Sequence, residues 1–284
     1  MASTASRPTD MLRRRIAGEV RAFFNDRSRG QEPVKSSPDA LSPPHGVAWR
    51  VHGDVTSMMV GGIAALLLQM LHPKALAGVW DHSDFQRNMH GRLRNIARFI
   101  AVTTYGARAD AEAAIARVRR IHDHVSGTTP DGSAYDANDP RLLAWVHVAG
   151  SAMFLDGWIR FGEPAMSAAD RDTYWAEVAP VARMLGADPV PGTVAEAEAL
   201  LASFRSELSA DERSTTVANL IRRKPPGTLR AFPIQALLMQ SATDLLPEWA
   251  RRMHGLRSSG LGRPAIGAAT LGLAGTLRWA LTPR

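Results

Sequence analysis

Apolar residues recur along this chain at the three- and four-residue spacing of an amphipathic α-helix, whereas the alternation typical of a β-strand does not recur. Several apolar stretches end at a glycine, a proline or a short polar run, as helices do. The pattern therefore predicts an all-α fold. The expected helices cover residues 10–27, 54–71, 74–80, 91–105, 108–125, 140–161, 168–185, 193–208, 210–222, 229–242, 247–256 and 264–281.

Capping residues support several of these boundaries. Short polar side chains that can accept a backbone hydrogen bond stand directly before the apolar periodicity begins, which is where a helix cap is needed. A proline in the first turn adds to this signal because that position needs no amide donor. The expected caps are Asp10, Asp54, Asp139 before Pro140, Ser167 with Asp170, and Ser209 with Glu212.

Two polar stretches interrupt the helical pattern. Residues 28–44 are rich in serine, proline and glycine, which predicts a loop or arm, and residues 128–138 form a second polar loop. No internal repeat and no further linker follow. We therefore expect residues 1–44 to form an N-terminal helix and flexible arm, and residues 45–284 to form a single multi-helix domain.

The composition is that of a folded globular protein, since 45% of its 284 residues are apolar and 21% are charged. It contains no cysteine, which excludes disulfides, iron–sulfur clusters, thiolate-bound zinc and covalently attached haem. The longest apolar run, 58–71, is shorter than the roughly 20 residues that span a bilayer. We therefore expect a cytoplasmic protein without a transmembrane segment. The C-terminal stretch 265–281, interrupted by Arg278, predicts a docking helix or one that associates weakly with a membrane surface.

The net charge is +7, and nearly all of the basic residues are arginines. A basic protein can bind nucleic acid or anionic membranes. The arginines of this chain are dispersed, however, and form no single stripe with interleaved aromatic residues. Nucleic acid is therefore not an expected partner.

Motif searches remove several enzyme classes. The chain has no Glu-x-x-His pair of a di-iron bundle, no His-Glu-x-x-His zinc site and no P-loop. The Gly-Leu-Gly at 260–262 follows no strand, and the Gly-Ser-Ala at 150–152 lacks the second glycine of a nucleophile elbow. Histidine is the chemically useful residue type that remains, and most of the nine histidines lie in the first half of the chain.

His122 falls on the apolar face of its predicted helix. Ile115 and Val118 lie seven and four positions before it, and Val125 lies three after it. A buried imidazole must find partners for its nitrogens or bear a desolvation cost. A haem iron would meet that need, because neutral imidazole is its usual protein ligand. The alternative is a core histidine that bonds to a backbone carbonyl.

Arg92 begins the helix expected at 91–105, and Ile96 and Phe99 follow it on one face. An arginine on a mainly apolar face needs an anionic partner. A haem propionate, an oxygen ligand or a glutamate could each supply that negative charge.

Two further histidines are candidates. His147 lies on the apolar helix expected at 140–161. His72 directly precedes Pro73 and could instead cap the last carbonyls of the helix before it. Both therefore have a structural role as the alternative to cofactor binding.

Seven short sequence blocks follow one another in the same order as in the family of rubber oxygenases (latex clearing proteins) and MpaB-type oxygenases, and the chain resembles this family. The resemblance covers roughly residues 45–250. The blocks are Trp-Arg-Val-His-Gly-Asp at 49–54, Leu-Leu-Leu-Gln-Met-Leu-His-Pro at 66–73, Gly-Arg-Leu-Arg at 91–94, Thr-Tyr-Gly at 104–106, Val-Arg-Arg-Ile-His at 118–122, Tyr-Asp-Ala-Asn-Asp-Pro at 135–140 and Leu-Leu-Ala-Trp-Val-His at 142–147.

The resemblance implies an all-α fold with a globin-like helical core around a haem pocket. It implies that His122 is the proximal iron ligand of a haem b, and that Arg92 lies in the distal pocket and orients bound oxygen or a propionate. Members of the family use dioxygen to cleave a carbon–carbon double bond or to modify a terpenoid chain. The remaining cofactor-binding candidates are Ile96, Phe99, His147 and His72.

The sequence departs from the latex-clearing pattern around Arg92. Ile96 stands where those enzymes have a threonine, Asn95 where some have a lysine, and the acids nearest to their upstream glutamate are Asp81 and Asp84. An apolar distal side is less able to move protons. We therefore expect a haem-dependent oxidoreductase that uses dioxygen on a small apolar, terpenoid- or lipid-like substrate. The alternatives are a non-catalytic haem-binding protein (a carrier, a sensor or a degenerate member) and a basic helical module.

Overall fold

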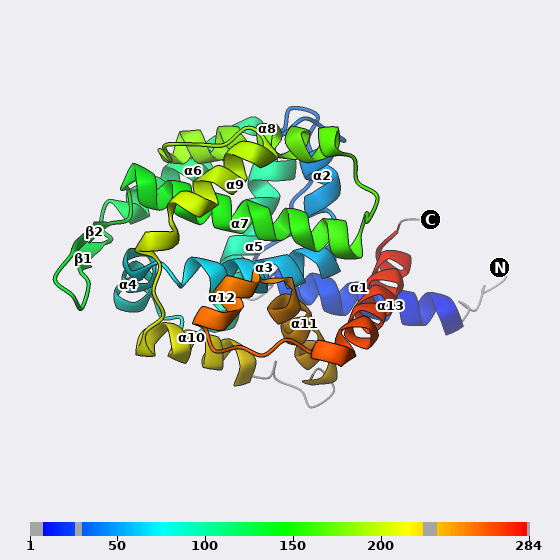
Figure 1. Ribbon diagram of the computed structural model, residues 1–284. Coiled ribbons are helices and arrows are strands. Elements are labelled where there is room, and N and C mark those ends of the chain that lie inside the picture. The colour runs from blue at the N-terminus through cyan, green and yellow to red at the C-terminus, as the bar shows by residue number, and fades with distance from the viewer. Residues whose placement is uncertain (1–7, 26–29, 224–231, 283–284) are drawn as a thin grey trace.

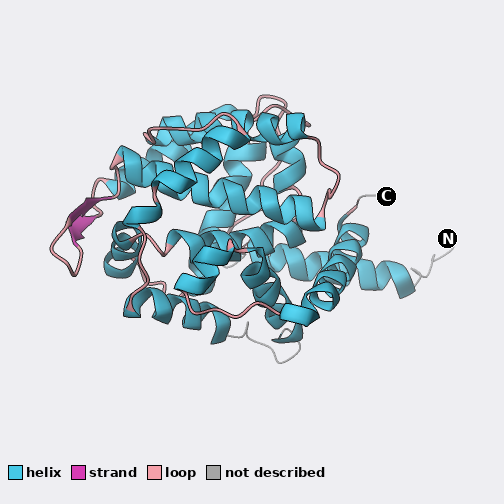
Figure 2. Cartoon of the chain, viewed as in Figure 1, coloured by secondary structure: helices cyan, strands magenta, loops and turns pink. Residues whose placement is uncertain are grey.

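The computed structural model describes residues 8–25, 30–223 and 232–282, so the predicted helix ends at 26–27 and 229–231 lie outside the described residues. Helices dominate the described residues, whose only β-sheet is a two-stranded hairpin (Figure 2), and the all-α prediction is confirmed. The first half contains α1 (Pro8–Phe24), α2 (Val47–His52), α3 (Val55–Gln69), α4 (Pro73–His82), α5 (Met89–Tyr105), α6 (Arg108–His122), β1 (Ser126–Thr128), β2 (Ala134–Asp136) and α7 (Pro140–Phe161). The second half contains α8 (Ala168–Leu185), α9 (Val194–Ser203), η2 (Arg205–Glu207), α10 (Glu212–Arg223), α11 (Phe232–Leu245), α12 (Glu248–Met253), η4 (Gly260–Gly262) and α13 (Arg263–Leu281).

The helices α3 and α7 form the centre of the fold and pack closely against each other (Figure 1). Both are apolar on most of their circumference, which is the pattern of a helix buried on all sides. Helices α11 and α13 cover α3, and α8 and α9 cover α7. Two polar contacts link the central pair: Gln69 Nε2 donates to the Val146 carbonyl at 2.8 Å, and Trp145 Nε1 donates to the Gln69 carbonyl at 3.2 Å.

Two glycines allow α3 and α7 to approach closely. A Cβ added at Gly61 would lie 2.6 Å from the Met153 carbonyl oxygen, and one added at Gly157 would lie 2.8 Å from the Ser57 carbonyl oxygen. No side-chain carbon fits at such distances, so the backbones of the two helices meet directly at this crossing.

Three of the predicted caps are confirmed. Asp54, Asp139 and Ser167 each accept a hydrogen bond from the backbone N–H three residues later, at 2.8 to 3.0 Å. These bonds satisfy donors that the first helical turn leaves without a partner. Asp10 is not the cap of α1, because that helix begins two residues earlier and places Asp10 in its first turn.

The other differences between the predicted and the observed elements involve only a few residues each. The box that caps α10 joins Asp211 with Ser214, not Ser209 with Glu212. The expected loop at 128–138 contains most of the antiparallel hairpin. Its strands of three residues, and the six residues of the unpredicted α2, are too short to show a hydrophobic period.

The N-terminal helix α1 packs along α13 and reaches α5, so the two ends of the described chain lie side by side (Figure 1). Farther along the predicted arm, Ala40 forms an isolated β-bridge with Ala107. The division of the chain into an arm at 1–44 and a domain at 45–284 stays a prediction.

The C-terminal helix α13 docks on α1, α11 and α3, which confirms the docking alternative. Arg278 anchors it, because its Nε donates to Asp54 Oδ2 at 2.7 Å and its terminal nitrogen donates to the Phe161 carbonyl at 2.6 Å. Leu271 and Trp279 stay exposed on α13, and weak membrane association stays a prediction. By length and composition, α7 could cross a membrane, as could α3 and α4 taken as one bent span, but 67% of the apolar window of α7 is buried inside the fold.

Candidate functional site

Arg92 and His122 lie at the same end of the α5–α6 pair. Arg92 is in the first turn of α5, which Asn88 caps by accepting from the Gly91 N–H at 3.0 Å. Helix α6 follows after a short turn at 106–107 and packs against α5, so its last residue, His122, returns to the beginning of α5. The positive charge of Arg92 acts on the pKa of His122, which places the two side chains within electrostatic range.

The imidazole of His122 is half-buried, and its Nδ1 is buried without a hydrogen-bond partner. Burial lowers the pKa of His122; Asp123 and Asp136 oppose this shift, and Arg92 adds to it. Among the described residues no partner bonds either ring nitrogen. The backbone carbonyl expected as the partner of a core histidine is therefore not found among the described residues.

Arg92 is half-buried and forms no ion pair with a described residue, and its buried Nε has no hydrogen-bond partner. Burial lowers the pKa of its guanidinium. The glutamate alternative is therefore not observed in the described part of the chain. An uncompensated cation beside an unpartnered imidazole is an environment that an anionic ligand would stabilise.

Apolar side chains accompany these two residues. Ile96, one turn after Arg92, is 39% exposed, and Phe99 is half-buried. Ile121, the residue before His122 on α6, is another large apolar side chain and is 53% exposed. Exposed apolar residues beside polar candidates are typical of a surface that contacts an apolar ligand. The assignment of Ile96 and Phe99 to a pocket wall stays a prediction.

His147 lies between α7 and α8. Its ring meets Trp175 edge-on with the centroids 6.0 Å apart, and its Nδ1 lies 3.4 Å from Ser151 Oγ. Its Nε2 is buried without a partner. Burial, with a smaller contribution from Arg183, lowers the pKa of His147 to about 4. One unpartnered buried nitrogen keeps this residue among the cofactor-binding candidates.

His72 makes structural contacts. Its Nδ1 accepts from the Lys74 N–H at 3.3 Å, so it caps the start of α4 and not, as the sequence suggested, the end of α3. Its Nε2 lies 3.6 Å from Glu207 Oε2, and its ring packs beside Trp145 and Phe204. Because both nitrogens are engaged, these contacts favour the structural alternative, and cofactor binding by His72 stays a prediction.

The sequence reasoning missed two acids beside His122. Asp123, just after α6, and Asp136, on β2, both oppose the lowering of its pKa. Asn138 bonds to both acids, since its Nδ2 donates to Asp123 Oδ1 and its backbone N–H donates to Asp136 Oδ1, each at 2.7 Å. Asp136 and Asn138 belong to the block at 135–140, but no local pattern shows that the hairpin returns this block to His122.

The two upstream acids are both engaged. Asp81 accepts from the Tyr135 hydroxyl at 2.9 Å and lies 3.5 Å from Arg213, and Asp84 pairs with Arg87 at 2.6 Å. Carboxylates held in this way are poorly placed to accept a proton elsewhere. We therefore assign neither of them as a general base.

A model of the family described as ER-bound oxygenase mpaB/B'/Rubber oxygenase, catalytic domain, matches residues 49–279. The chain belongs to this family. The resemblance seen in the sequence is thereby confirmed, and no curated protein and no solved structure matches the chain. The match runs from α2 to α13, so every candidate residue described above lies inside the oxygenase domain. Membership in the family supports an oxygenase-type function.

His52 shows what a fully bonded histidine looks like in this oxygenase domain. Its Nδ1 lies 2.9 Å from Thr104 Oγ1, its Nε2 lies 3.2 Å from the Tyr174 hydroxyl, and its ring meets Phe154 edge-on. Burial lowers the pKa of His52 to about 4. Unlike His122, it has no nitrogen left for a ligand.

We expect acid to destabilise the protein between pH 6.5 and pH 4, the interval over which the pKa values of His52 and His147 are shifted. In this interval the unfolded chain binds protons at both residues and the folded protein does not, so the unfolding free energy falls as the pH falls. Desolvation by neighbouring groups raises the pKa of Asp156 to about 6, and this shift acts in the opposite direction, but residue 156 keeps contact with solvent, which screens the effect. His52→Gln should reduce the loss of unfolding free energy between neutral pH and mildly acidic pH by about 2 kcal/mol.

Urea unfolding at pH 7 and at about pH 4.5 measures this difference. His124→Gln changes an exposed histidine and serves as the control, with the same loss as the wild type. Equal losses in the wild type and in His52→Gln would contradict the idea that a buried neutral His52 drives the pH dependence.

Proposed function

We propose that this protein is a haem b-dependent oxidoreductase that uses dioxygen on a small apolar substrate of the terpenoid or lipid kind. Membership in the oxygenase family supports the reaction type. The observation that carries the proposal is the pair of buried nitrogens without partners, His122 Nδ1 and Arg92 Nε, at one end of α5 and α6.

A haem fits the chemistry of these residues. The porphyrin supplies four ligands to its iron, so a single imidazole is enough from the protein. Its propionates are anions of the kind that a guanidinium binds. The described residues contain no group of three or more histidines or acids that could hold a metal ion by themselves. When bound, the haem would supply the activation of dioxygen.

His122 would hold the iron through one imidazole nitrogen. Burial lowers the pKa of His122, which keeps the ring neutral near pH 7 and its lone pair available. Asp123 and Asp136 add negative charge beside the ring. Acids close to a ligand histidine increase its basicity, so these two residues would strengthen its donation to the metal.

Arg92 would bind a propionate or orient the oxygen substrate. Its guanidinium is half-buried and unpaired, so its attraction to an anion is stronger than it would be in water. Arg92 is the residue to which we assign a catalytic role, because no other described cation combines burial, proximity to His122 and a lack of partners.

The apolar character of the surrounding residues supports an apolar substrate. Ile96 and Phe99 follow Arg92 on α5, and Ile96 brings no hydroxyl group that could relay a proton. Asp81 is engaged with the Tyr135 hydroxyl. The same two observations favour a second candidate function, a haem-binding protein without catalytic activity, over the acid–base chemistry of rubber cleavage.

Visible spectroscopy and oxygen uptake test the proposal. Protein produced with a haem precursor should show a Soret band, and an oxygen electrode should record uptake that depends on an added terpenoid or unsaturated fatty substrate. Arg92→Met should lower oxygen uptake per bound haem about tenfold or more, because it removes a positioned charge. Arg117→Met, in an exposed arginine of α6, is the matched control and should retain the activity.

The two measurements separate the candidate functions. A Soret band without substrate-dependent oxygen uptake would favour the non-catalytic haem protein. Protein that binds no haem under these conditions would refute both forms of the proposal. Equal activity in Arg92→Met and the wild type would remove Arg92 from the catalytic role.

A further inference from the structure

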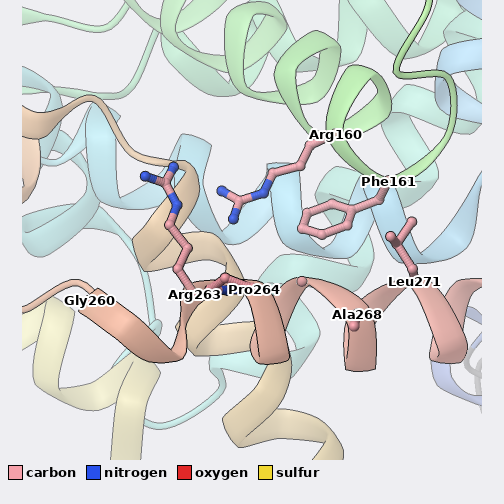
Figure 3. Close-up of a pocket in the computed structure, with 8 residues that line it drawn as sticks. Arg160, Phe161, Gly260, Arg263, Pro264, Ala268 and Leu271 are labelled. Atoms are coloured by element: carbon pink, nitrogen blue, oxygen red, sulfur yellow. The ribbon is translucent and has the colours of Figure 1, made fainter.

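An open pocket of about 590 Å³ lies between the C-terminal end of α7 and the first half of α13 (Figure 3). None of the residues that line it is a candidate of the site at His122 and Arg92. Fourteen residues of α7, or about 21 Å of helix, separate its wall residue Phe161 from His147. Its volume lies in the range of small-molecule sites.

Two arginines converge at one end of this pocket. Arg160 on α7 and Arg263 at the start of α13 reach toward each other in Figure 3. Each donates one hydrogen bond to the same acceptor, the backbone carbonyl of Asp244, at 3.0 Å. Burial lowers the pKa of Arg160, the charge of Arg263 lowers it further, and the charge of Asp244 opposes this shift. The fold therefore holds two cations together against their mutual repulsion.

No carboxylate forms an ion pair with either guanidinium among the described residues. The nearest acid, Asp244, uses its carboxylate elsewhere. Its Oδ1 accepts from the Ser259 N–H at 2.9 Å and from Gln240 Nε2 at 3.4 Å, and its Oδ2 accepts from the Ser259 hydroxyl. Two cations and one occupied carboxylate leave the pocket one positive charge in excess, which a single anionic group would balance.

The rest of the pocket is apolar. Phe161 and Leu271 form its wall beyond the arginines (Figure 3), and Leu271 is 45% exposed. Ala268 and Gly267 line it along α13. A Cβ added at Gly267 would meet no atom within 4 Å, so open space remains beside the helix at this point. A charged end followed by an apolar wall matches a ligand with an anionic head and an apolar tail.

We propose that this pocket binds a single-chain amphiphile with a carboxylate head, such as a fatty acid. The two guanidinium groups of Arg160 and Arg263 bind the carboxylate, and their planar N–H pairs suit its two oxygens. The tail lies along α13 past Gly267 and Ala268 toward Leu271. This site is additional to the oxygenase site and does not depend on haem binding.

Calorimetric titration of the full-length protein with dodecanoate, below its micellar concentration, tests the proposal. We expect one molecule bound per chain, with dodecanol and acetate binding at least tenfold more weakly, because each lacks one half of the matched chemistry. The double variant Arg160→Gln/Arg263→Gln should weaken dodecanoate binding at least tenfold. Arg117→Gln, at an exposed arginine, should leave it unchanged.

A second pair of variants tests the tail site without removing a charge. Gly267→Leu fills the open space, and Gly275→Leu places the same side chain on α13 outside the pocket lining, where an added Cβ also meets nothing within 4 Å. Replacing a helical glycine favours the helix in both, so both should fold. Only Gly267→Leu should weaken dodecanoate binding, again at least tenfold.

Three results would overturn the proposal. The first is no dodecanoate binding by the wild type, and the second is equal affinity of Gly267→Leu and Gly275→Leu. The third is loss of dodecanoate binding in His122→Ala, which would place the ligand in the oxygenase site. Unchanged affinity in His122→Ala supports a separate pocket, whatever the outcome for haem.

Discussion

His122→Ala is expected to abolish the Soret band of the protein produced with a haem precursor. Among the described residues, His122 supplies an imidazole that has a buried nitrogen without a partner and lies within electrostatic range of Arg92, and alanine has no group that can bind iron. Absorbance near the Soret maximum, divided by protein concentration, measures the effect. We expect at least nine tenths of the bound haem to be lost, provided that no other side chain binds the iron in place of His122.

Two controls separate a ligand from a structural residue. His124→Ala removes an exposed histidine two positions along the chain and should keep the band. Adding imidazole to His122→Ala should restore the band, because a small ligand can occupy the space of the missing ring, whereas it cannot repair a misfolded protein. A full-strength band in His122→Ala itself would refute the assignment and make His147, the other site histidine with an unpartnered buried nitrogen, the next to test.

Gly61→Ala is expected to destabilise the protein, and Gly62→Ala to stabilise it. A Cβ at Gly61 would lie 2.6 Å from the Met153 carbonyl oxygen, so α3 and α7 must move apart, at a cost of about 2 kcal/mol or more. At Gly62 the nearest atom is Phe154 Cε1 at 3.6 Å, an ordinary contact, and the gain in helix propensity of about 0.5–1 kcal/mol remains.

Thermal unfolding measures both changes. We expect the melting temperature to fall by roughly 5 °C in Gly61→Ala and to rise by roughly 2 °C in Gly62→Ala. Gly157→Ala, on the other side of the crossing, should resemble Gly61→Ala because its Cβ would lie 2.8 Å from the Ser57 carbonyl oxygen. If Gly61→Ala and Gly62→Ala changed the melting temperature in the same direction, α3 and α7 would be packed less closely than the structure indicates.

The candidate site was predictable from the sequence only in part. The helical period placed Arg92 near the start of one helix and His122 near the end of the next, and consecutive packed helices bring such positions to the same end. The ordered blocks indicated the family that the comparison with known proteins confirmed. The position of Asp136 beside His122 was not predictable, because a hairpin of three-residue strands carries it back to this site.

The same limit applies to the histidines. His52, His72 and His122 all stand within blocks that resemble the family, and their local sequence does not show which of them is left without a bonding partner. In the fold, Tyr174 comes from α8 to bond His52, and Glu207 lies beside His72, whereas no described residue bonds the ring of His122. Whether a buried imidazole is available to a ligand therefore depends on side chains far away in the sequence.

The sequence by itself determined the helical class, three of the helix caps and the family, because each depends on residues close together along the chain or on their order. Only the tertiary structure decided that Gly61, and not Gly62, lies at the crossing of α3 and α7, and that Arg160 and Arg263 share one pocket. These properties are set by groups that lie far apart in the sequence, since Gly61 meets Met153 and Arg160 shares its pocket with Arg263. A local pattern carries no information about which distant groups will meet, so only the packed fold can reveal them.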